Sequence, residues 1–104
     1  GQPWEKSKVF ANSAVVGPWR PLKNLEALME APFELRVNSQ IRQQGQGRDM
    51  RWKPLEILSD LRKWFPICEG DLLFTGTPEG VGPLKAGDRL EIRGPGVEYR
   101  LNCV

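Results

Sequence analysis

Apolar and polar residues alternate along several short stretches of this chain, a pattern that is typical of half-buried β-strands. Phe33, Leu35 and Val37 alternate with charged neighbours, and Asn38-Ser39 separates them from a second run at 41–44. Turn residues between two such runs predict a β-hairpin, although Ser39 suits a type I′ turn less well than glycine would. Three further strands are expected, at Leu72–Thr75, Arg89–Arg93 and Glu98–Cys103.

Leucines recur at helical spacing between two prolines in the middle of the chain. Leu55, Leu58 and Leu61 lie three residues apart, after Pro54 and before Pro66. Proline favours the first position of a helix and ends one that it follows, so we expect a main helix at about 54–65. A shorter helix or helical turn is expected within 21–31, whereas the first twenty residues predict extended or loop structure.

Five short strands and one main helix predict an α+β domain that is mostly β. The 104 residues fit one domain with one modest core. No apolar run is long enough to cross a bilayer and the start lacks a signal pattern, so we expect no membrane association and a cytoplasmic location.

The composition argues against several kinds of catalytic, metal-binding and nucleic-acid-binding site. The chain contains no histidine, which excludes Ser-His, Cys-His and His-metal arrangements within it. Cys68 and Cys103 lack the spacing of a metal site and are expected to be buried free thiols. Lysine and arginine are scattered among the acids, at a net charge of +2, so a basic nucleic-acid module is disfavoured.

The stretch from Asp71 to Asp88 contains the strongest candidate for a binding site. Its apolar start runs into the turn Thr75-Gly76-Thr77-Pro78 and then into two more Gly/Pro turns. Such a loop presents hydroxyls and backbone N–H groups with little side-chain bulk, which suits a carboxylate or other small anion. The two aspartates each follow a glycine and are expected to shape turns.

These residues and several upstream motifs resemble the fumarylacetoacetate hydrolase family. The C-terminal motifs are Gly70-Asp71, Thr75-Gly76-Thr77-Pro78, Gly80-Val81-Gly82-Pro83-Leu84 and Gly87-Asp88. The upstream ones are the run from Gln2 to Phe10, Gly17-Pro18, Val37-Asn38, Arg42-Gln43 and Asp49-Met50. Arg48 and Arg51-Trp52 depart from the pattern, because smaller or aliphatic residues are more typical beside Asp49-Met50.

The resemblance implies a fragment of the family's β-roll or sandwich fold. It covers residues 1–104 as a partial domain, the family's C-terminal portion, with the portion that carries the metal ligands absent. In the family, two Glu and one Asp hold Mg²⁺ or Mn²⁺, which chelates a 2-oxo acid or enolate. The chain alone is therefore expected to bind no metal.

The same resemblance implies roles for a few residues here. Lys8 corresponds to the catalytic lysine that meets a substrate oxygen, with Lys6 as its competitor. Thr77 corresponds to the threonine that meets a carboxylate, and Thr75 and Gly76 complete the substrate-binding turn. The implied reactions are hydrolysis, decarboxylation or isomerisation of diketo or oxo-dicarboxylic acids such as acylpyruvate, oxaloacetate or hydroxymuconate-like compounds.

A second interpretation remains open. The chain could be a truncated, non-catalytic structural or binding protein that folds alone or as a homodimer. An apolar face is expected wherever a missing portion would pack, and that face would favour dimerisation. Metal-dependent turnover distinguishes the first interpretation, and a stable oligomer without metal binding distinguishes the second.

Overall fold

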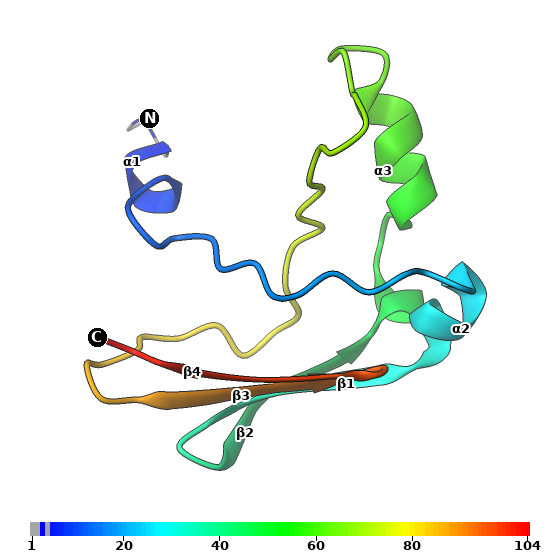
Figure 1. Ribbon diagram of the computed structural model, residues 1–104. Helices are drawn as coiled ribbons and strands as arrows, with labels where there is room; N and C mark the ends of the chain where they lie inside the picture. Colours follow the sequence, from blue (N-terminus) through cyan, green and yellow to red (C-terminus); the bar gives the residue numbers. More distant parts are fainter. Residues whose placement is uncertain (1–2, 4) are drawn as a thin grey trace.

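The computed structural model describes residue 3 and residues 5–104. It contains a four-stranded antiparallel sheet. The helices and the long connections lie to one side of this sheet (Figure 1). Within the described residues, no helix has both the length and the apolar character needed to span a bilayer.

The predicted hairpin consists of β1 (Pro32–Val37) and β2 (Gln40–Gln46). Its two turn residues, Asn38 and Ser39, have φ of 52° and 70°, the positive values that a type I′ turn requires. Ser39 therefore adopts this conformation although it is not glycine. A register shift between Leu35 and Arg36 marks a bulge in the ladder.

The C-terminal hairpin completes the sheet with β3 (Arg89–Gly94) and β4 (Val97–Asn102), as predicted. The strand order is β2-β1-β3-β4, so β1 and β3 are central. Val37 of β1 is 6% exposed and is the one buried apolar residue in the described part of the chain.

Side chains join the two hairpins where β3 begins. The Asn38 amide donates to Asp88 Oδ1 at 2.8 Å, and Asn38 Oδ1 accepts from the Arg89 N–H at 3.0 Å. The Lys85 N–H donates to the other oxygen of Asp88 at 2.8 Å. Both bonds lower the pKa of Asp88, and the backbone bond from Lys85 has the larger effect. The expected turn-shaping role of this aspartate is confirmed.

Asp71 has the equivalent role in its own turn. Its Oδ2 accepts from the Cys68 N–H at 2.8 Å, and its N–H donates to the Cys68 carbonyl at 3.3 Å.

Both cysteines are free thiols, but Cys68 is exposed and only Cys103 is partly buried. The expectation of a buried thiol is therefore wrong for Cys68, which lies in this surface turn.

The main helix, α3, spans Pro54–Leu61 and begins at the predicted proline. The Lys53 N–H donates to the Glu56 carboxylate at 2.7 Å, which satisfies one free donor at the helix start. The helix ends four residues before the predicted boundary, because the Trp64 and Phe65 N–H groups both bond the Leu61 carbonyl in a tightened turn.

Two short helices lie in the N-terminal third. The predicted helix within 21–31 is α2 (Leu25–Glu30), whose N-cap Asn24 accepts from the Ala27 N–H at 3.0 Å. The helical turn α1 (Glu5–Lys8) corrects the expectation that the first twenty residues are wholly extended or loop. A 3-10 turn, η1 (Gly47–Asp49), follows β2.

Residues 72–75 do not form the predicted strand, so the described chain has four strands rather than five. A strand requires a partner for its N–H and C=O groups. Residues 71–74 share a small pocket with 15–17 and Trp19, but Pro18 in that neighbouring stretch has no N–H to donate. In the part of the chain that the structure describes, the apolar run at 72–74 pairs with no strand.

Candidate functional site

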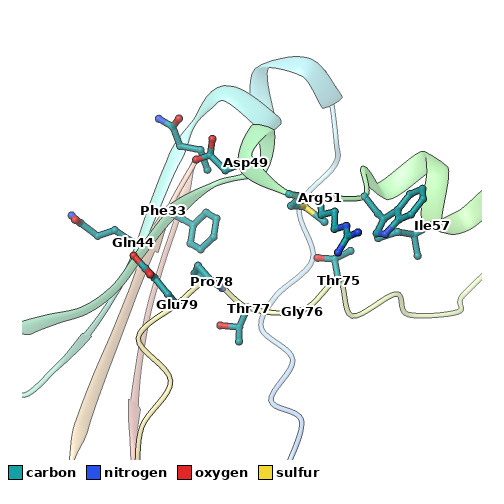
Figure 2. A pocket seen from close by; sticks show the side chains of 14 residues that line it. Phe33, Gln44, Asp49, Arg51, Ile57, Thr75, Gly76, Thr77, Pro78 and Glu79 are labelled. Atoms are coloured by element: carbon teal, nitrogen blue, oxygen red, sulfur yellow. The ribbon is translucent and has the colours of Figure 1, made fainter.

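A pocket of about 580 Å³ lies between the Thr75–Pro78 turn and the segment that links β2 to α3. Its wall combines apolar side chains from β1, the linking segment and α3 with polar side chains from β2, the linking segment and the turn (Figure 2). Its lining residues are Phe33, Gln44, Gly45, Gln46, Asp49, Met50, Arg51, Trp52, Ile57, Thr75, Gly76, Thr77, Pro78 and Glu79.

All three residues predicted for substrate binding, Thr75, Gly76 and Thr77, line this pocket. Gly76 has a φ of +92°, a conformation that residues with a side chain rarely adopt. In an extended strand, residues two apart would point to the same side, but this glycine turns the chain between the threonines. Thr77 accordingly points away from Arg51 and Phe33, whereas Thr75 lies close to Arg51 (Figure 2).

Gln43 of β2 holds the Thr77 side of the turn. Its Nε2 donates to Thr77 Oγ1 at 2.8 Å and to the Pro78 carbonyl at 2.9 Å, and it approaches the Glu79 carbonyl at 3.4 Å. The two protons of one amide therefore hold two successive residues of the loop, and a third lies close by. Thr77 itself is exposed, and its bond to Gln43 lies at the surface.

The backbone packs closely against β2 just beyond these bonds. Gly80 has a φ of +96°, and a Cβ placed on it would lie 2.2 Å from the Arg42 carbonyl oxygen. A Cβ on Gly82 would lie 2.6 Å from the Arg42 guanidinium. Glycine at these positions lets the loop approach the strand closely enough for Gln43 to reach it.

Lys53 fixes the opposite wall of the pocket. Its ammonium group donates to the Arg48 carbonyl and, at 2.8 Å, to the Met50 carbonyl. These bonds fold the segment just before α3 so that Arg51 and Trp52 line the pocket. Arg51, a departure from the family pattern, thus brings a positive charge to the pocket that Thr75 also lines.

Lys8, the predicted catalytic lysine, ends α1 and is exposed. It is not among the residues that line this pocket. The structure thus brings Thr75, Gly76 and Thr77 together but does not add Lys8 to them, and the role of Lys8 stays a prediction.

A divalent metal site needs several oxygen ligands converging on one point. Among residue 3 and residues 5–104, no three Asp, Glu, His or Cys side chains converge in a way that could hold a metal ion. The described residues therefore do not fit the metal that the family resemblance implies.

Sequence reasoning named Gln43 only as part of a motif and gave it no role. The sequence carried no clear signal, because Gln43 lies between exposed Arg42 and Gln44 and pairs with Leu35 only in the bulged register of the folded hairpin. A partly buried amide at such a position needs hydrogen-bond partners. Which partners it finds depends on a loop more than thirty residues away.

Comparison with known proteins decides the family. The family model for the C-terminal region of fumarylacetoacetate hydrolase matches residues 1–104. The chain belongs to the fumarylacetoacetate hydrolase family. The resemblance seen in the sequence is therefore confirmed, and so is the α+β fold class.

Family members of assigned activity are similar over most of this chain. Oxaloacetate tautomerase YcgM of Escherichia coli K12 is 40% identical over 93 residues, which are 88% of this chain and 42% of that protein. A crystal structure of fumarylpyruvate hydrolase from Pseudomonas aeruginosa, in complex with Mn²⁺ and pyruvate, is 36% identical with a TM-score of 0.90. The match covers 98% of this chain and 44% of the Pseudomonas aeruginosa chain.

A fumarylacetoacetate hydrolase family protein from Yersinia pestis CO92 has a crystal structure with a TM-score of 0.91 and 36% identity. The match covers 99% of this chain and 49% of that one. The chain thus spans about half the length of the relatives it matches.

Proposed function

We propose that this chain forms the carboxylate-binding wall of an enzyme that acts on a small oxo acid. The observation that carries the proposal is the exposed Thr77 hydroxyl, held in place by Gln43 on the Thr-Gly-Thr-Pro turn. A fixed hydroxyl donor suits a carboxylate oxygen, and it loses little conformational freedom when the ligand binds. Oxaloacetate and fumarylpyruvate, the substrates in the relatives' names, both carry carboxylates.

The proposed reaction class is isomerisation or hydrolysis of a diketo or oxo-dicarboxylic acid, with decarboxylation as a further possibility within the family. Lys8 would supply a positive charge to the oxyanion that develops in such reactions. Mg²⁺ or Mn²⁺ would be held by acidic residues outside residues 1–104, which form a partial domain in this proposal. The chain alone is then expected to be inactive, and a cytoplasmic location stays a prediction.

A homodimer of the 104-residue chain is the second part of the proposal. Six exposed apolar residues form what we call the N-terminal patch, from two segments that line one small pocket. They are Val15, Val16, Trp19, Leu72, Leu73 and Phe74. Contiguous exposed apolar surface of this kind favours association.

The activity is tested in a chimaera in which residues 1–104 replace the matching region of the Escherichia coli oxaloacetate tautomerase. We expect Mg²⁺- or Mn²⁺-dependent turnover of oxaloacetate or fumarylpyruvate. Because a hydrogen bond to a charged group is lost, Thr77→Val should lower kcat/KM by about tenfold or more. Lys8→Ala should abolish turnover, whereas the control Lys6→Ala on the same helical turn should not.

Circular dichroism and metal binding establish that the chimaera is folded and loaded. A folded, metal-loaded chimaera that turns over neither substrate would contradict the proposed activity. Equal losses for Lys8→Ala and Lys6→Ala would remove the role of Lys8 while leaving that of Thr77 intact.

A further inference from the structure

Gln43 holds the loop in place, and its amide also bonds the hydroxyl oxygen of Thr77. We propose that Gln43 is a positioning residue that leaves Thr77 as a hydrogen-bond donor toward the ligand and so selects an anionic oxygen. The inference rests on the proposed function, since it concerns how the same turn recognises its carboxylate.

The direction of the bond follows from the chemistry of the two groups. The atom of Gln43 that faces Thr77 is Nε2, 2.8 Å from Oγ1, and an amide nitrogen donates but does not accept. Thr77 Oγ1 is therefore the acceptor in this bond. Its own proton must point elsewhere, and Thr77 is an exposed residue.

The geometry keeps this arrangement fixed. The same nitrogen also donates to the Pro78 carbonyl at 2.9 Å, so the amide cannot rotate freely about its end. The close approach of Gly80 to the Arg42 carbonyl holds the loop against β2 at the next turn of the chain. The hydroxyl is thus presented with one of its two lone pairs occupied and its proton available.

A hydroxyl in this state favours one class of ligand atom. It can donate its proton to a carboxylate oxygen, which only accepts, and a hydrogen bond to an ionised acceptor is stronger than one to a neutral acceptor. The turn should therefore bind a carboxylate more tightly than the corresponding carboxamide, whose oxygen accepts the same bond but carries no charge. Gln43→Glu reverses the arrangement, because an ionised carboxylate at this position accepts the Thr77 proton and presents a negative charge to the ligand.

The bond itself is tested in the 104-residue chain by nuclear magnetic resonance of the glutamine side-chain amides. We expect the Gln43 amide resonances to shift on Thr77→Val and to stay unchanged on the control Thr75→Val, which makes no bond to Gln43. If both variants leave the Gln43 resonances unchanged, the hydrogen bond does not exist and the proposal is wrong.

Its consequence is tested in the chimaera by kinetics. Gln43→Glu should raise KM for the oxo acid about tenfold or more, with a smaller effect on kcat, and the control Gln40→Glu on the same strand should not. A double-mutant cycle separates positioning from structural support. In the Thr77→Val background, Gln43→Glu should cause less than about a twofold further rise in KM.

Three kinetic outcomes overturn the proposal. If Gln43→Glu raises KM equally with and without the Thr77 hydroxyl, Gln43 acts only through the loop backbone. If Thr77→Val raises KM but Gln43→Glu does not, the hydroxyl binds the ligand without help from Gln43, and the proposed function survives. If Thr77→Val itself has no effect on KM, the proposed function fails and this inference fails with it.

Discussion

Gly80 is the residue at which the loop and β2 come closest. Its φ of +96° disfavours any side chain, and a Cβ would lie 2.2 Å from a backbone oxygen of Arg42. Backbone cannot yield as the end of a flexible side chain can. A substitution here must therefore push the loop away from β2, and with it the groups that Gln43 holds.

We expect Gly80→Ala to lower the free energy of unfolding by more than Gly70→Ala does. Gly70 has a nearly equal φ of +95° but nothing within 4 Å of its Cβ position, so it measures the conformational cost alone. The clash at Gly80 should add about 1 kcal/mol or more to that cost. Urea denaturation of both variants checks this, and equal losses would mean that the loop does not press on β2.

At the level of elements, local signals were sufficient where partners are near in sequence. Both hairpins follow from alternation and turn residues, and α3 begins at the proline that predicted it. Residues 72–75 show the limit, because their apolar composition favours a strand but a strand exists only beside a partner. The bond from Gln43 to Thr77 also lay beyond local reasoning, since it joins elements 34 positions apart.

The junction between the two hairpins makes stability depend on pH. The pKa of Asp88 is lower in the folded chain than its ordinary value of 3.8. The main cause is the hydrogen bond that the Lys85 N–H donates to the carboxylate, and the second is the bond from the Asn38 amide. A carboxyl group with a lowered pKa stabilises the fold above its unfolded pKa. That contribution is lost as the pH falls from about 3.8 toward the folded pKa.

Asp88→Asn should therefore reduce stability at neutral pH and flatten the loss of stability below about pH 4. Unfolding by urea at a series of pH values measures both effects. Glu69→Gln, at an exposed carboxylate outside the sheet, serves as the control and should leave the acid limb unchanged. An acid limb as steep in Asp88→Asn as in the parent chain would assign the pH dependence to other groups.

The whole molecule is more open than its length requires. Its radius of gyration is 15.3 Å, whereas a compact domain of this length has about 13 Å. Val37 is the only buried apolar residue among those the structure describes, and large apolar side chains such as Trp19, Trp52, Leu55 and Trp64 are more than half exposed. The tryptophans described here thus do not form a core, and Trp4 lies outside the described residues.

This exposure predicts self-association of the 104-residue chain through the N-terminal patch. Burying apolar surface stabilises a dimer by about 25 cal/mol per Å² of apolar area before the costs of association. Trp19 is 74% exposed and Phe74 is 64% exposed, so both have large areas to bury. We expect sedimentation equilibrium to give a concentration-dependent species of twice the 11.8 kDa chain mass.

Trp19→Glu should weaken this dimer about tenfold or more, because a charge would have to be buried where an aromatic anchor was. Ile41→Glu is the matched control, since Ile41 is also exposed, at 49%, but lies on β2 outside the patch. A monomer at all concentrations would contradict the dimer. Equal weakening by both substitutions would mean that the contact also involves the sheet, or that the association is nonspecific.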